Sequence, residues 1–126
     1  MGEQVEVAPH VVVGTFRRDG ATVSRVDGVV DMVTCDDVRT EIIACLEEPS
    51  GVLVLDLAAV TFFGTIGLSM LIEARHRAER RGVRFAVAAD QRAVLKPMTE
   101  TGIADLVVLR AGVREAVAAA RAPIVV

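Results

Sequence analysis

Residues 52–57 constrain the fold of this chain more than any other segment. They read Val-Leu-Val-Leu-Asp-Leu, a run that is apolar except for Asp56, and the turn-forming residues Pro49, Ser50 and Gly51 precede it. A run this short and this apolar is typical of a strand that is buried on both faces, as happens when helices cover both sides of a sheet. The segment therefore predicts an α/β domain with this strand at the centre of its sheet.

The segments on either side of this strand alternate between strand and helix patterns. Residues 11–16 and 21–26 are short β-type runs joined by turn-forming residues, so they predict a β-hairpin. Helices are predicted to start near Thr34, Thr65, Asp90 and Val113, and short strands are predicted at 84–88 and 107–109. The expected fold is a single α/β domain of residues 1–126. It has a mixed, partly parallel sheet, a leading hairpin and about four helices, and residues 1–9 are a candidate flexible segment.

Capping signals mark the expected helix ends. Thr34 precedes Cys35 and two acidic residues, so it predicts the N-cap of the first helix, and Asp90 is a candidate cap for the third. Gly82 follows an arginine-rich last turn and predicts the C-cap of the second helix. Pro97 falls inside the third helix pattern, so we expect either a kink there or a helix that begins late.

The composition argues against several classes of function. The net charge of −3 disfavours a general nucleic-acid binder, for which a basic excess is expected. Acidic residues gather in 19–56 and arginines in 75–84, and we interpret both groups as solvated helix faces rather than dedicated binding patches. No segment approaches the ~18 apolar residues of a membrane span, and the first residues lack the pattern of a signal peptide. We therefore expect a cytoplasmic protein that does not bind membranes.

The cysteines and histidines do not predict a metal site. Cys35 and Cys45, if they lie on one helix, are ~15 Å apart along its axis, which is too far for a disulfide. His10 and His76 stand in no zinc-ligand spacing with either cysteine. We expect two isolated buried or half-buried thiols, and no metal or cofactor.

No motif for catalysis is present in the sequence. The chain contains neither a glycine-rich nucleotide loop nor a nucleophile elbow, so we expect no enzymatic activity. Asp56 with Asp36 or Asp37 is a weak alternative, because carboxylates at strand ends hold Mg²⁺ in receiver-type domains. Turn and cap roles explain the same aspartates without a metal ion.

Thr65 lies at the transition from strand to helix, in the stretch Phe-Phe-Gly-Thr-Ile-Gly-Leu-Ser-Met of residues 62–70. A hydroxyl at this place could accept a phosphate, help to bind one, or cap the helix. A bound phosphate would meet free backbone N–H groups and the positive end of the helix dipole. The N-cap is the commonest of these roles, and it is the one that we predict.

Three segments resemble the STAS domain family, whose best-known small members are anti-sigma factor antagonists. They are residues 52–68, the turn 28–31 and residues 93–103, which agree with the family in order and spacing. The resemblance implies a single STAS-like domain that binds an anti-sigma factor of the GHKL kinase type and thereby releases a sigma factor. It implies no direct contact with nucleic acid, and a homodimer is a further candidate assembly.

The family's usual motif reads Asp-Ser-Ser-Gly-Leu or Asp-Ser-Thr-Gly-Leu, and its second hydroxyl residue is phosphorylated by the partner. On this chain the family's Asp corresponds to Gly64, its first Ser to Thr65 and the phosphoacceptor to Ile66. Because isoleucine has no oxygen to phosphorylate, the family's off-switch is predicted to be missing. Thr65 is a weak substitute, since a shift of one residue turns a side chain by ~100° around the helix. The resemblance also implies a partner interface made of Asp31, Gly64, Thr65, Ile66, Gly67, Leu68, Asp90 and Ala93.

Two questions stay open at the level of sequence. STAS domains also occur as sensory or scaffold modules, so a module that binds a small ligand or nucleotide, or a structural component of a signalling complex, is the alternative function. Ile66 itself has two candidate roles, an apolar contact in an interface or packing under the first helical turn.

Overall fold

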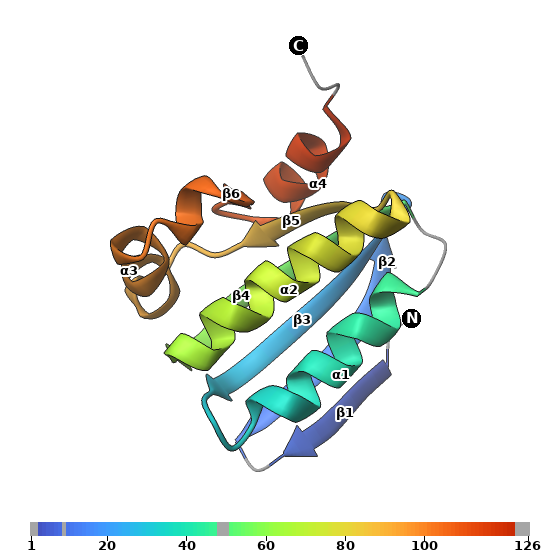
Figure 1. The fold of residues 1–126 in the computed structure, drawn as a ribbon. Coiled ribbons are helices and arrows are strands. Elements are labelled where there is room, and N and C mark those ends of the chain that lie inside the picture. The colour runs from blue at the N-terminus through green and yellow to red at the C-terminus, as the bar shows by residue number, and fades with distance from the viewer. Residues whose placement is uncertain (1–2, 9, 48–50, 123–126) are drawn as a thin grey trace.

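The computed structural model describes residues 3–8, 10–47 and 51–122. In this part of the chain one sheet is covered by helices on both faces (Figure 1). The strands are β1 (Glu3–Ala8), β2 (Val11–Arg18), β3 (Ala21–Val30), β4 (Val52–Phe63), β5 (Arg84–Ala88) and β6 (Val108–Arg110). The helices are α1 (Cys35–Leu46), α2 (Thr65–Arg81), α3 (Arg92–Glu100) and α4 (Val113–Arg121), with a short 3₁₀ turn at Ile103–Asp105.

The order of the strands in the sheet follows their order in the chain, from β1 to β6. β1, β2 and β3 are antiparallel neighbours, whereas β3, β4, β5 and β6 are parallel neighbours. Each parallel pair is connected through a helix, as parallel strands require. The predicted α/β class, the mixed sheet and the leading hairpin, which is β2–β3, are therefore confirmed. β1 is an additional strand within residues 1–9 that the sequence analysis did not predict.

The sheet divides the hydrophobic core into two layers. Leu53, Leu55 and Leu57 of β4 belong to the layer under α1, α2 and α3, while Val52 and Val54 belong to the layer under α4. Each of the five is at most 8% exposed. β4 is thus buried on both faces in its first half, as its sequence predicted. Burying such side chains contributes about 1.5–3 kcal/mol each.

The start of α3 differs from its prediction. Asp90 does not cap this helix, because the N-cap is Gln91, whose backbone is extended. The Gln91 side-chain amide donates to the carbonyls of Leu57 (2.6 Å) and Val60 (2.8 Å), so the side chain ties α3 to β4 instead of leaving that position to Asp90. Pro97 lies inside α3, and the helix begins before it, so the expectation of a late start is wrong.

Two of the glycines with positive φ, Gly82 after α2 and Gly28 within β3, occupy positions that a larger residue would strain. Gly82 ends α2 with φ +68, and its N–H donates to the Glu79 carbonyl (3.2 Å), which confirms the predicted C-cap. Gly28 has φ +119, and a Cβ there would come within 2.0 Å of the His10 carbonyl oxygen. That carbonyl accepts the Val29 N–H (3.0 Å), so the close approach lies where the end of β3 passes His10, just before β2.

Candidate docking surface

Helices α1 and α2 begin side by side, at the lower left of Figure 1, where β3 and β4 end. β3 and β4 are paired up to Val30 and Phe63, so the two strands end at the same level of the sheet. The Gly64 N–H donates to the Val30 carbonyl (2.9 Å) and joins the two exits. The carboxyl ends of parallel strands are where α/β domains place functional loops, so this edge is the candidate site.

The chain enters α1 through a turn that is built from polar side chains. One carboxylate oxygen of Asp31 accepts the N–H groups of Val33 (2.9 Å) and Thr34 (3.1 Å). The Thr34 hydroxyl donates to the Val29 carbonyl (2.8 Å) and accepts the Asp31 N–H (3.0 Å). Thr34 is the N-cap, as predicted, but its hydroxyl bonds to the preceding turn and makes no bond to an N–H of the helix. Asp31 thus organises this entrance, in the manner of an Asx turn.

The entrance to α2 lacks such side-chain bonds. The prediction that Thr65 caps α2 is wrong: the N-cap is Gly64, with extended backbone (φ −82, ψ 175), and Thr65 is the first helical residue. No side chain caps the helix, and its first turn contains no acidic residue. The Gly64 carbonyl accepts the N–H groups of Gly67 (2.9 Å) and Leu68 (3.4 Å), so the backbone alone starts the helix. With Gly64 as the N-cap, α2 begins one residue earlier than it would if the Thr65 hydroxyl capped it.

Beneath its first turn, α2 is packed tightly against the sheet. Gly67 is buried, and a Cβ on it would lie 2.9 Å from the Phe63 ring and 3.1 Å from a methyl group of Val30. Leu68 is 4% exposed and belongs to the core. Gly67 and Leu68, two of the predicted interface residues, therefore support the surface from below.

Four large apolar side chains are exposed around this entrance. Met32 is 86% exposed, Val33 74%, Phe62 53% and Ile66 40%. We call these four residues the apolar patch. Together with Asp31, Gly64, Thr65 and Ser69, they line an open hollow of about 550 Å³. Of the two roles left open for Ile66, the exposure of its side chain favours a surface contact over packing under the helix.

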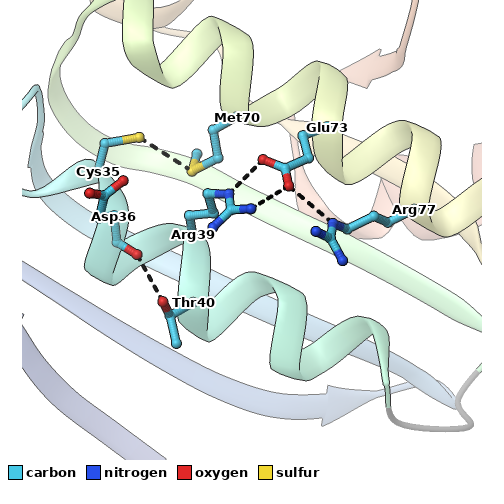
Figure 2. Close-up of polar contacts among 7 residues, drawn as sticks. All are labelled: Cys35, Asp36, Arg39, Thr40, Met70, Glu73 and Arg77. Atoms are coloured by element: carbon cyan, nitrogen blue, oxygen red, sulfur yellow. Dashed lines mark hydrogen bonds and ion pairs between the residues drawn. The ribbon is translucent and has the colours of Figure 1, made fainter.

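Cys35, the first residue of α1, points toward Met70 of α2 (Figure 2). Its thiol donates to the Ile66 carbonyl (3.6 Å) and lies 3.9 Å from the Met70 sulfur. Burial raises the pKa of Cys35, and the negative charge of Asp36 raises it further. The thiol therefore stays protonated near neutral pH and serves packing. Cys45 is buried as well, with its sulfur 3.6 Å from the Thr15 hydroxyl.

An ion-pair network on the surface fixes α1 to α2 (Figure 2). The Arg39 guanidinium donates two hydrogen bonds of 2.5 Å to the Glu73 carboxylate, which also pairs with Arg77 at 3.1 Å. The hydrogen bond from Arg39 lowers the pKa of Glu73 from 4.5 to about 2, with a further contribution from Arg77. The geometry is bidentate, which fixes the distance between the helices that carry the docking edge.

Other predicted residues lie apart from the hollow. Asp90 is exposed and Ala93 half-buried at the start of α3, and neither lines the hollow. Asp56 is 7% exposed, accepts the Ala58 N–H (3.0 Å), and pairs in register with Ala88, a residue of the layer under α4. Asp36 and Asp37 belong to α1 on the opposite face, so the Mg²⁺ alternative is wrong. In the described part of the chain no three His, Cys, Asp or Glu side chains gather as a metal site requires.

Three residues of the apolar patch were missed by the sequence analysis. Met32 and Val33 form an apolar pair inside a turn whose other members are polar, and Phe62 precedes the helix-starting glycine. An apolar pair between Asp31 and Thr34 was a usable signal, because turns are normally polar. The exposure of Phe62 had no such signal, since a strand residue can face either side.

The comparisons with known proteins agree with this fold. The STAS domain family model matches residues 15–118. An anti-sigma factor antagonist from Mycobacterium paratuberculosis is similar, with 30% sequence identity and a TM-score of 0.84 over 91% of this chain and 98% of that one. No curated protein sequence gives a significant match.

Two further solved structures are similar in fold. One is an anti-sigma-factor antagonist (STAS) domain protein from Planctomyces limnophilus, with 14% identity and a TM-score of 0.72 over 87% of this chain and 98% of that one. The other is the anti-sigma factor antagonist SpoIIAA in its unphosphorylated form, with 14% identity and a TM-score of 0.67 over 99% and 100%. Among the described residues, no helix has the length and apolar character needed to cross a membrane.

Proposed function

The chain belongs to the STAS domain family and is similar to its anti-sigma factor antagonists, and from this premise we propose that it binds a GHKL-type anti-sigma factor and thereby releases a sigma factor. The interface centres on residues 64–67, with Asp31 beside them and Asp90 and Ala93 at its margin. The protein acts by binding and performs no catalytic step. It works in the cytoplasm, where its partner and the sigma factor meet, and contacts neither nucleic acid nor membrane.

The observation that carries this proposal is the apolar patch around Ile66. Four of the five large hydrophobic side chains that are exposed in the described part of the chain gather at this one edge. Exposed apolar groups scattered singly need no explanation, but a contiguous group of them marks an interaction site. Its position at the start of α2 coincides with the loop that the family resemblance implies for docking.

We further propose that phosphorylation does not switch this docking off. A phosphate adds about −2 charge, which would disrupt a fitted apolar interface. Ile66 offers no oxygen for it, and its exposed hydrocarbon fits an apolar contact instead. The Thr65 hydroxyl is exposed, but it projects from the preceding helical position, ~100° away around the axis.

The test uses the purified chain with GHKL-type anti-sigma factors from the same genome, in the presence and absence of ATP. We expect binding that ATP does not reverse and no incorporation of phosphate. Ile66→Asp places a charge where the family places its phosphate and should weaken binding at least about 100-fold, whereas Ile66→Val should retain it. Incorporation of phosphate on Thr65 would overturn the proposal that phosphorylation does not switch docking off. Absence of binding to every such factor would overturn the partner.

The hollow also gives some support to the alternative function, binding of a small ligand. Its volume of about 550 Å³ falls within the range of small-molecule pockets, and its walls are mainly apolar. A thermal-shift screen against nucleotides and small apolar ligands distinguishes this function, because a ligand at ~100 times its Kd adds ~2.7 kcal/mol of stability. A ligand-dependent shift that disappears in Phe62→Ala would support it.

A further inference from the structure

We propose that the docking surface selects a partner segment whose apolar side chains are bordered by lysine or arginine. This inference rests on the proposed function and specifies the chemistry of the partner's contact surface. It comes from the charges that surround the apolar patch, which no family resemblance supplies.

The apolar patch is concave and is formed by three separate segments. Met32 and Val33 come from the turn before α1, Phe62 from the end of β4 and Ile66 from the first turn of α2. A hollow of about 550 Å³ between them accepts inserted side chains, whereas a flat patch would only be covered. The partner therefore contributes at least one projecting apolar side chain.

The charged side chains on the hollow and in the adjoining first turn of α1, which we call its border, are acidic, although only Asp31 is part of the lining. Asp36 and Asp37 are exposed in that turn. Asp36 lies three residues before Arg39 in α1, so it shares the helix face from which Arg39 reaches Glu73 of α2. Its carboxylate has no hydrogen bond or ion pair with another described residue, so it is available to a partner.

Among the described residues, no basic side chain forms an ion pair with Asp31, Asp36 or Asp37. Arg39 is bound to Glu73, and the first turn of α2 carries no charge. Arg92, at the start of α3, and Arg110, at the end of β6, are exposed basic residues at this end of the sheet, and neither lines the hollow. An apolar segment with acidic neighbours would be repelled here, and one with basic neighbours would be attracted.

The charge of the molecule is also polarised along α2. This helix begins uncharged at the hollow and ends with Arg80 and Arg81, about 24 Å away at 1.5 Å per residue. The acidic end therefore faces a basic partner while the basic end points away, which orients the encounter as well as attracting it. A second copy of this chain would present the same acidic border, so the surface disfavours self-association.

The test neutralises the border in Asp36→Asn/Asp37→Asn and compares it with Glu47→Gln/Glu115→Gln. Glu47 ends α1 far from the hollow and Glu115 lies on α4, and both are exposed. Each double variant changes the net charge from −3 by two units to −1, so only the position of the lost charge differs. Circular dichroism and thermal unfolding establish that both variants are folded before binding is measured.

Association and dissociation rates with purified GHKL-type anti-sigma factors are measured at about 20 mM and about 300 mM salt. We expect the border variant to associate about three- to tenfold more slowly at low salt and to lose most of the salt dependence. The control variant should stay within about twofold of the unchanged chain. An equal loss in both variants, or binding without salt dependence, overturns this inference and leaves the proposed function intact.

A pair of synthetic helical peptides tests the inference without a natural partner. Both present the same row of leucines, flanked by lysine in one peptide and by glutamate in the other. We expect only the lysine peptide to bind, and Ile66→Asp to abolish its insertion. Binding of both peptides, of the glutamate peptide alone or of neither overturns the inference. Self-association of the chain that Ile66→Asp abolishes would assign the surface to a second copy and overturn it as well.

Discussion

The entrances to α1 and α2 lie next to each other and are built in opposite ways. At α1, Asp31 and Thr34 bind each other and the backbone, and two aspartates occupy the first helical turn. At α2, Gly64 starts the helix without a side-chain cap, and the first turn contains neither an acid nor a base. One entrance is stabilised by polar side chains, and the other has no side-chain cap and exposes an isoleucine to the solvent.

This difference separates stability from function at one edge of the sheet. Caps and first-turn acids stabilise a helix start by about 1 kcal/mol each. α2 lacks both, and it is anchored from below through Gly67 and Leu68 instead. The solvent-exposed side of the first turn of α2 is thereby free for a partner, while the Arg39–Glu73 pair fixes α2 to α1. Substitutions among the exposed residues at the start of α2 can therefore alter which partner is bound without disturbing the buried contacts of Gly67 and Leu68.

The largest expected effect breaks the support of α2 from below. Gly67→Ala adds a Cβ that would lie 2.9 Å from the buried Phe63 ring, so we expect the free energy of unfolding to fall by about 2 kcal/mol. Ser69→Ala alters an exposed side chain of the same helix and should change stability by less than about 0.5 kcal/mol. Chemical denaturation measures both. Equal stability of Gly67→Ala and the unchanged chain would show that the space under α2 is looser than the structure has it.

The next effect compares the two entrances directly. Asp31→Ala removes the carboxylate that accepts two backbone N–H groups, so we expect a loss of about 1 kcal/mol. Thr65→Ala removes a hydroxyl that caps nothing and should cost less than about 0.5 kcal/mol. The two variants are compared by thermal and urea unfolding. If Thr65→Ala were as destabilised as Asp31→Ala, Thr65 would act as a cap after all, and the two helix entrances would not differ in side-chain stabilisation.

The smallest effect concerns the pair that links the helices. Glu73→Gln should lower stability at pH 7 by less than about 1 kcal/mol, because the Glu73 side chain is 33% exposed and solvent screens its charge. The pKa of Glu73 is lowered from 4.5 to about 2, so its contribution is present above pH 4.5 and is lost as the pH falls toward 2.

The difference in unfolding free energy between Glu73→Gln and the unchanged chain is measured from pH 7 down to pH 3. It should shrink across this range. Glu79→Gln is the matched control, since Glu79 pairs with Arg75 within α2 and links no second helix. A difference that stays constant with pH would mean that the carboxylate charge contributes nothing.

The regular elements could be predicted because their signals are local. The apolar run of β4, the arginine-rich end of α2 and Gly82 each carry their signal within a few neighbouring residues. The helix caps at Thr65 and Asp90 were predicted wrongly for a single reason. In each case the preceding or following residue is the N-cap instead. The backbone of Gly64 is bonded to β3 and the side chain of Gln91 to β4, and both strands are distant in the sequence.

The sequence by itself determined the alternation of strands and helices, the strand buried on both faces and the hydrocarbon at position 66, since periodicity and side-chain chemistry are properties of short segments. Only the tertiary structure decided that Met32, Val33, Phe62 and Ile66 meet around one hollow beside an acidic helix start. Exposure depends on where neighbouring elements end and on which groups pack over them, and parallel pairing brings together ends that are about thirty residues apart in the chain.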